Sequence, residues 1–234
     1  MLHSDHAIDI QQLQFRWREG QALVLDIEQL QVRKGERIFI KGASGSGKST
    51  LLSLMAGVLS PQQGRLQILD QILPQMKSAK RDAFRADHIG FVFQMFNLLP
   101  YLSVIDNVTL PLHFSKRRRQ RVTQPRIEAE RLLAHLDLCG EEVLSRPISE
   151  LSVGQQQRVV AARALIGSPE IIIADEPTSA LDADRRAAFI KLLLSECAAS
   201  DTTLVFVSHD EALQTHFDRS LALGEINRAM RTEV

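Results

Sequence analysis

Gly42-Ala43-Ser44-Gly45-Ser46-Gly47-Lys48-Ser49-Thr50 is the stretch that decides the fold of this 234-residue chain. It fits the pattern G-x-x-x-x-G-K-[ST], the Walker A phosphate-binding loop, and apolar runs at 38–40 and 51–55 flank it. This order predicts a strand, a glycine-rich turn and a helix. Glycines let successive backbone N–H groups turn inward around phosphates, and the N-terminus of the helix adds its positive dipole.

Two side chains of the loop carry specific chemistry. Lys48 is predicted to reach the β- and γ-phosphates of a nucleotide. Ser49 is predicted to place its hydroxyl on Mg²⁺, a hard cation that takes oxygen ligands. The alternative is a glycine-rich turn that matches by chance, and the strand and helix patterns on either side argue against it.

Composition narrows the functional classes. The chain holds 28 Lys plus Arg and 28 Asp plus Glu, so bulk charge favours neither nucleic acid nor a membrane surface as a partner. Its apolar runs are far shorter than the roughly 20 residues needed to cross a bilayer, so we expect no membrane-spanning segment. Residues 1–9 lack the order of a secretory signal, and Cys139 and Cys197 lack C-x-x-C spacing, which together suit a reducing cytosol.

Alternating apolar residues around the loop predict an antiparallel β region. The runs lie at 8–17, with a slip near Gln11-Gln12, and at 23–27 and 66–68. Trp17, the only tryptophan, is either a core or hairpin aromatic or a flat face on which a nucleotide base stacks.

The middle of the chain changes character after a predicted helix at 77–85 and a buried strand at 88–94. That strand ends on Gln94, where ligand-facing groups lie in open α/β sheets. Between 95 and 167 the pattern is helical, with a capping box at 103–106 and Pro125 at a first helical position. The basic run 116–121 could touch anionic lipid headgroups, but a solvated loop is favoured because no aromatic residues are interleaved.

A second apolar run, 171–174, ends in two carboxylates, as a Walker B strand does. It would deliver Asp175 to Mg²⁺, and Glu176, ionised at neutral pH, would polarise an attacking water. The alternative is that both carboxylates cap the next turn. A helix at 182–196 and a strand at 204–207, which leads to His209, then resume the βα order, and residues 227–234 are expected to form a short polar tail.

The segment 151–158 is a second predicted anion site. Ser152 and Gly154 open a helix and offer a hydroxyl and backbone N–H groups. One nucleotide cannot easily use two phosphate-binding helix starts in a compact subunit. The pair therefore predicts a two-fold dimer that shares its sites.

These motifs, in this order, resemble the nucleotide-binding subunits of ATP-binding cassette (ABC) transporters over nearly the whole chain. The resemblance implies an α/β fold and one domain, 1–234. A P-loop NTPase core with a mostly parallel sheet and an N-terminal antiparallel β region would span about 1–94 and 168–234. A helical subdomain insert, about 95–167, would carry the signature motif. The stretches 90–100 and 107–112 are similar to the lipoprotein-releasing and macrolide-exporting branch.

The resemblance also implies a role for each matched residue. ATP and Mg²⁺ are the implied cofactors, with Trp17 under the base. The phosphates would be held by Gly42, Ala43, Ser44, Gly45, Ser46, Gly47, Lys48, Ser49 and Thr50 of one subunit and by Ser152, Gly154 and Gln155 of the other. Catalysis would use Glu176, His209 and Gln94, Mg²⁺ would be held by Ser49, Gln94 and Asp175, and the D-loop would be Ser179-Ala180-Leu181-Asp182.

The implied function is Mg-ATP hydrolysis by a head-to-tail homodimer. The dimer would dock on integral-membrane permease subunits at the cytoplasmic face of the cell membrane, with Gln94 linking nucleotide state to the permease. One alternative is an ABC ATPase that signals across the membrane to cell-wall enzymes and moves no substrate. Another is an ABC protein of DNA repair or translation, but this chain lacks the coiled-coil insertion or second cassette usual there.

Val153 departs from the family pattern, which usually has glycine at this position. If the position needs a positive φ, valine would be strained. If it needs close approach to phosphate, the side chain would crowd the ligand.

Overall fold

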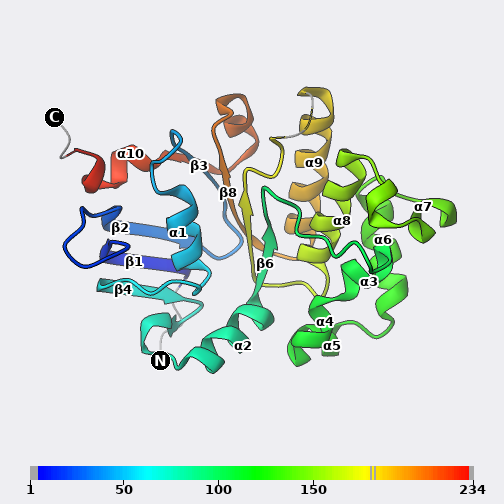
Figure 1. The fold of residues 1–234 in the computed structure, drawn as a ribbon, viewed down its shortest axis with the longest axis horizontal. Coiled ribbons are helices and arrows are strands. Elements are labelled where there is room, and N and C mark those ends of the chain that lie inside the picture. The colour runs from blue at the N-terminus through cyan, green and yellow to red at the C-terminus, as the bar shows by residue number, and fades with distance from the viewer. Residues whose placement is uncertain (1–4, 180, 182, 232–234) are drawn as a thin grey trace. The chain divides into compact units, whose positions relative to one another are not determined.

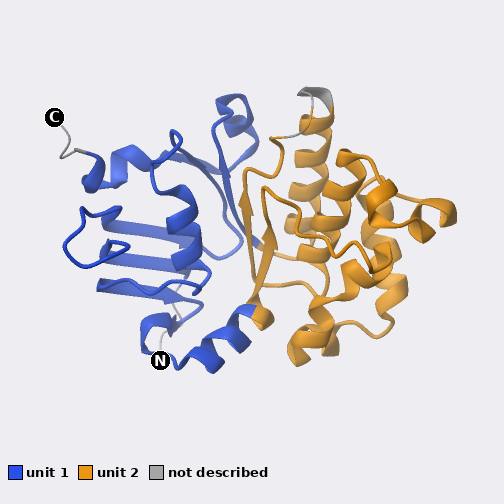
Figure 2. Ribbon diagram, in the orientation of Figure 1, with its two compact units in different colours: residues 1–85, 203–234 blue, residues 86–202 orange. Residues whose placement is uncertain are grey.

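The computed structural model describes residues 5–179, 181 and 183–231. The chain divides into two compact units, residues 1–85 with 203–234 and residues 86–202 (Figure 2). Helix α2 (Ser78–His88) crosses the division. The functional boundaries expected near 94 and 168 stay a prediction.

The first unit contains an antiparallel sheet of β1 (His6–Phe15), β2 (Leu25–Arg33), β4 (Gln63–Ile68) and β5 (Gln71–Ile72), in the order β2-β1-β4-β5 (Figure 1). The register of β1 against β4 shifts between Gln11 and Gln14, and Gln12 has a φ of 49°. This bulge confirms the predicted slip. It brings Leu13 onto the buried face that Ile10 already occupies, although their spacing is odd.

A parallel set of strands in the same unit carries the phosphate loop. Strand β3 (Arg37–Lys41) pairs on one side with β8 (Thr203–Ser208) and on the other with β9 (Arg219–Ala222). Ile38, Phe39 and Ile40 are all fully buried, so both faces of β3 are covered, which explains why its sequence is a continuous apolar run. Phe39 stacks on Phe206 with ring centroids 6.0 Å apart. The loop then leads into α1 (Lys48–Met55), and α10 (Leu223–Ile226) follows β9.

The second unit pairs β6 (Ile89–Val92) with β7 (Ile171–Asp175) in parallel, and helices and loops make up the rest of its described residues (Figure 1). Its helices are α3 (Val104–Thr109), α4 (Pro111–Phe114), α5 (Lys116–Arg121), α6 (Pro125–His135), α7 (Glu141–Ser145), α8 (Val153–Leu165) and α9 (Ala183–Ala199). Helix α8 packs against α3, α6, α9 and β6, so the signature segment begins the central helix of this unit.

Two predicted boundaries differ from the structure. His88 ends α2 instead of starting a strand, and its Nδ1 lies 2.9 Å from Glu170 Oε2. Strand β6 stops at Val92, so Phe93 and Gln94 lie in the following loop. The expected polar tail from residue 227 is also wrong over its described part, because Asn227 is fully buried and a 3-10 helix spans Arg228–Arg231.

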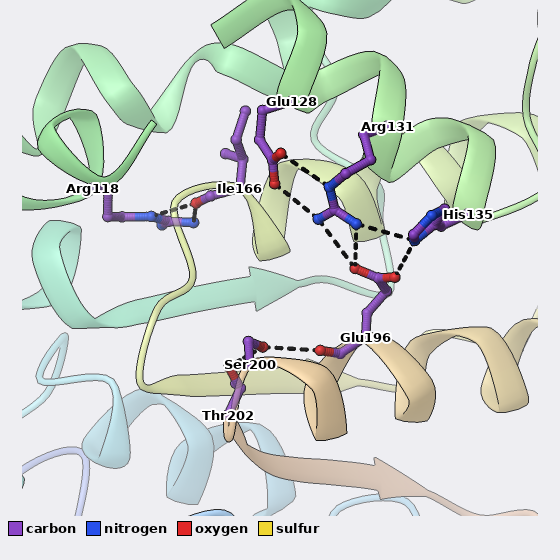
Figure 3. A network of polar contacts seen from close by, with 8 residues as sticks. All are labelled: Arg118, Glu128, Arg131, His135, Ile166, Glu196, Ser200 and Thr202. Atoms are coloured by element: carbon purple, nitrogen blue, oxygen red, sulfur yellow. Dashed lines mark hydrogen bonds and ion pairs between the residues drawn. The ribbon is translucent and has the colours of Figure 1, made fainter. Parts of the chain in front are cut away.

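The basic run 116–121 is neither a solvated loop nor a free cationic patch. It forms α5, and Arg118 is 2% exposed. Its guanidinium donates to the backbone carbonyl of Ile166 (Figure 3) and to that of Ala164. Burial lowers the pKa of Arg118 to about 10. Arg117 and Arg121 both bind Glu170.

A second polar cluster joins α6 to α9. Glu196 on α9 accepts hydrogen bonds from Arg131, and its Oε1 lies 2.7 Å from His135 Nδ1 (Figure 3). Arg131 also donates twice to Glu128, and hydrogen bonding to that carboxylate raises the pKa of Arg131. The cluster fixes the register between the two helices.

Candidate functional site

The predicted site residues fall into two sets, one in each unit. In the first unit, Gly45 and Gly47 of the phosphate loop have φ values of 80° and 94°, which a residue with a Cβ rarely adopts. Lys48 folds back over the loop, and its Nζ donates to the carbonyls of Gly42 at 2.6 Å and Ala43 at 2.9 Å. An ammonium has three N–H donors, so one remains for an anion.

The loop fits a phosphate group. Ser46 is 4% exposed, and its Oγ has no hydrogen-bond partner among the described residues. A Cβ added at Gly42 would lie 2.6 Å from that Oγ, so the turn closes tightly on itself. A buried hydroxyl without a partner is costly unless a ligand supplies one, and phosphate oxygens can do so.

His209 belongs to the same set. Strands β3 and β8 run in register, with Lys41 opposite Ser208. Gly42 and His209 each follow their strand, so the phosphate loop and the histidine leave the sheet at its carboxyl-terminal edge, where ligands of α/β sheets bind. His209 is exposed.

Trp17 is not a core residue. Its side chain is 60% exposed, and its ring meets Phe15 edge-on, with centroids 5.3 Å apart at 85°. An edge-to-face contact orients an indole while leaving ring surface open. The exposure favours the base-stacking interpretation over the core one.

In the second unit, Gln94 and Asp175 lie at the same end of the neighbouring strands β6 and β7. Val92 lies opposite Ala174 in the β6–β7 register, Asp175 comes next on β7, and Gln94 follows β6 by two residues. Gln94 is exposed and Asp175 half-buried. An amide and a carboxylate oxygen at one strand edge suit Mg²⁺.

Glu176 has a constrained backbone. Its φ is 47° and the residue is 9% exposed, a conformation that costs about 1–3 kcal/mol for a residue other than glycine and is typical of active sites. The turn is held from α8, where the buried Gln157 side chain donates to the carbonyl of Pro177. Sequence reasoning missed Gln157, because in the sequence it is one of three consecutive glutamines.

The signature segment begins α8 with a capping box. Ser152 Oγ accepts from the N–H of Gln155 at 3.3 Å, and Gln155 Oε1 accepts from the N–H of Ser152 at 2.9 Å. Val153 is the first helical residue, 46% exposed, and its φ is not positive. The strain considered for valine at this position is therefore absent.

Arg163, near the end of α8, is a further residue that the sequence did not reveal. Its Nη1 and Nη2 donate to the carbonyls of Asn97 and Phe96, each at 2.7 Å, and burial lowers its pKa. The helix that opens with Ser152 thus also holds the loop that follows Gln94. No spacing rule pairs a helical arginine with those carbonyls.

Part of the expected D-loop lies outside the described residues, namely Ala180 and Asp182. Within the described ranges, no group of three His, Cys, Asp or Glu side chains could hold a metal. A Mg²⁺ ion shared with phosphates needs only one or two protein carboxylates, so the single carboxylate of Asp175 has the chemistry of such a ligand. No helix in the described part of the chain has the length and apolar character to cross a membrane.

A strand-to-helix phosphate loop, a strand ending in two carboxylates and a second capped helix start define an ATP-hydrolysing nucleotide-binding cassette. The ABC transporter family model matches residues 25–179, and the chain belongs to this family. The predicted family, α/β fold class and ATPase activity are confirmed.

Individual relatives agree with this membership. The chain is 38% identical over 213 residues to the lipoprotein-releasing system ATP-binding protein LolD of Chromohalobacter salexigens, covering 89% of this chain and 87% of that one. It is 40% identical over 212 residues to the macrolide export ATP-binding/permease protein MacB of Chromobacterium violaceum, covering 90% of this chain and 32% of that one. The solved dimer of the ATP-binding cassette MJ0796 with ADP and Pi has a TM-score of 0.81 and 33% identity, covering 92% and 93% of the two chains.

Proposed function

We propose that two copies of this chain bind two ATP molecules head to tail and drive conformational change in a membrane permease of the export or lipoprotein-extracting type. The observation that carries the proposal is a pair of helix starts that can bind anions. One is the loop before α1, whose Ser46 hydroxyl has no hydrogen-bond partner among the described residues, and the other is the start of α8, which Ser152 caps. The dimeric cassette with ADP and Pi supports the two-fold arrangement.

In this proposal the phosphate loop and Lys48 bind the phosphates of one ATP, and Ser152 with Gly154 of the other copy complete its pocket. Mg²⁺, when bound through Ser49, Asp175 and Gln94, supplies neutralisation of phosphate charge. The chain's own donors are preorganised, since Lys48 already bridges two carbonyls of its loop. Phosphoryl transfer depends mostly on such positioning.

Glu176 acts on the attacking water in this proposal, and His209 contacts the γ-phosphate. A general base must hold its carboxylate in one place, and the turn after β7 is restrained at Glu176 and Pro177. Trp17 stacks on the base.

The names of the relatives support a permease as the partner. The lipoprotein-releasing and macrolide-export names belong to LolD and MacB, and a partner of the same class would hold this chain on the cytoplasmic face of a membrane. Arg163 would help to couple the nucleotide state to the permease, because its hydrogen bonds join the loop after Gln94 to α8, the helix that begins with the signature segment. ATP binding would close the dimer and hydrolysis reopen it, so the work comes from differential affinity for two states.

Mixed dimers test the shared pocket. Lys48→Met removes the ammonium, and Ser152→Asp keeps a good helix cap while it repels phosphate. Each variant alone should be nearly inactive. An equal mixture should recover about one quarter of the wild-type rate, because about half of random dimers are mixed and each holds one intact pocket. Mixed dimers that form, as shown by differently tagged subunits, yet stay inactive would refute the proposal.

Co-purification tests the partner. The tagged chain, expressed in its own host with the membrane fraction solubilised, should retain an integral-membrane permease. The ATPase rate of that complex should change when candidate lipoprotein or small-molecule cargo is added. A chain that carries no membrane protein under these conditions contradicts the transport role.

A further inference from the structure

We propose that Asn227 is a positioning residue that sets the spacing between the phosphate loop and the base-stacking Trp17. This rests on the proposed function, which gives Lys48 the phosphates and Trp17 the base. Asn227 is the C-cap of α10, a helix that contacts β2, and it is far from the phosphate loop and from Trp17 in sequence. Figure 1 labels both elements. All residues involved belong to the first unit.

Asn227 is 0% exposed, and its amide is fully engaged. Its Nδ2 donates to the carbonyl of Val24 at 2.9 Å and to the carbonyl of Ser46, in the phosphate loop, at 3.5 Å. Its Oδ1 accepts from the N–H of Asp26 at 2.9 Å. One amide therefore bridges the backbone of the phosphate loop and the backbone at the start of β2.

The phosphate loop lies very close to the residues at the start of β2. A Cβ added at Gly47 would lie 3.0 Å from Leu25 Cδ2 and 3.3 Å from the carbonyl of Val24. Such a contact leaves little room for relaxation. A buried asparagine with both ends of its amide bonded fixes the two segments in one register.

A hydrogen bond and a ring contact connect the start of β2 to Trp17. The N–H of Val24 donates to the carbonyl of Phe15 at 2.8 Å, and Phe15 packs edge-on against Trp17. The intervening Arg16 is held by Gln62, which accepts from its N–H at 2.9 Å and donates to its carbonyl at 2.8 Å. A continuous bonded path thus runs from the loop through Asn227 to Trp17.

ATP bridges the two ends of this path, whereas tripolyphosphate contacts only the loop. If Asn227 sets the spacing, its loss should make the base stack inefficient and leave phosphate binding nearly intact. Asn227→Ala should weaken binding of Mg-ATP about tenfold and of Mg-tripolyphosphate less than twofold, the difference being the size of one base–aromatic stack. Asn227→Ser, a smaller change, is carried through the same measurements in case the alanine variant does not fold.

A double-mutant cycle gives the deciding measurement. In the wild type, Trp17→Ala should lower ATP affinity about tenfold. In the Asn227→Ala background the same change should cost less than threefold, because the stack is already lost, so the two effects are not additive. Equal costs in both backgrounds would overturn the positioning role alone. No cost of Trp17→Ala in the wild type would overturn the base-stacking role in the proposed function, and the inference with it.

Asn107 provides the matched control for a purely structural effect. It too is 0% exposed, and its amide bonds the backbone at Leu99, Leu102 and Ser103 in the second unit. Asn107→Ala should lower the midpoint of urea unfolding to a comparable degree, yet leave the ratio of ATP to tripolyphosphate affinity unchanged. A ratio that falls equally in both variants would overturn the assignment to Asn227.

Discussion

Arg118 donates from Nε to the carbonyl of Ile166 at 2.8 Å, and its Nη2 donates to the carbonyl of Ala164 at 2.8 Å. Ile166 is the C-cap of α8, so a buried cation closes the helix whose other end is capped by Ser152. The last carbonyls of a helix lack partners within it, and a positive charge there also suits the helix dipole. The insert helix α5 thus stabilises the helix that carries the signature segment.

Loss of this cap should destabilise the protein. Arg118→Met keeps much of the side-chain volume but leaves two buried carbonyls without donors, which should lower the free energy of unfolding by about 1–3 kcal/mol. Urea denaturation measures the change. Arg119→Met, an exposed change in the same helix, should alter stability by less than about 0.5 kcal/mol. Equal free energies of unfolding for Arg118→Met and Arg119→Met would show that the hydrogen bonds of Arg118 do not stabilise the protein.

Glu170 should make stability depend on acid pH. Burial raises its pKa, but hydrogen bonds from His88, Arg117 and Arg121 outweigh that effect and hold the pKa well below its usual range. A carboxylate with a lowered folded pKa stabilises the protein above its unfolded pKa, and this stabilisation is lost as the pH falls toward the folded value.

Between pH 4.5 and 3, the wild type should therefore lose stability more steeply than Glu170→Gln, by up to about 1.4 kcal/mol per pH unit. Urea midpoints at several pH values give the two slopes. Glu142→Gln is the control, since its exposed ion pair with Arg146 should leave the wild-type slope unchanged. Parallel curves for wild type and Glu170→Gln would show that the carboxylate has no special environment.

The segments predicted to bind phosphate and Mg²⁺ could be placed in the fold from the sequence, because their chemistry demands particular residues at fixed spacing beside strand ends. Gly42 to Thr50 follows β3, and Asp175 ends β7, as their apolar runs predict. The β1 bulge was also readable, since the alternation of buried residues changes phase there. These signals are local, and a single stretch of chain contains each of them.

The sequence did not predict the hydrogen bonds that buried polar side chains make with backbone groups far away along the chain. Arg118 and Ile166 are 48 positions apart, and Asn227 and Ser46 are 181 apart. A carbonyl acceptor carries no residue signature, so nothing in the sequence marks which arginine of a basic run will be buried. Arg118 therefore resembled a solvated charge, and Asn227 resembled part of a polar tail.

Removing the carboxylate of Glu176 should separate ATP binding from hydrolysis. We expect Glu176→Gln to lower turnover by about 10²–10⁴, the usual contribution of a general base, while ATP affinity stays near wild type. Phosphate release and equilibrium nucleotide binding measure the two quantities. Glu141→Gln, an exposed glutamate on α7, serves as the control with wild-type turnover. Near wild-type hydrolysis in Glu176→Gln would reject its assignment as the base.

Val153 tests how closely the start of α8 approaches phosphate. Its φ is not positive, so glycine there relieves no strain, and crowding of the ligand is the remaining effect of the valine side chain. Val153→Gly should leave the ATPase rate equal or higher, and Val153→Ala should behave alike, because alanine removes the bulk without the flexibility of glycine. Steady-state phosphate release measures both rates, with urea midpoints to correct for the roughly 1 kcal/mol that glycine costs in a helix. A large fall in rate for both variants at unchanged stability would mean that valine itself contacts the nucleotide-bound partner.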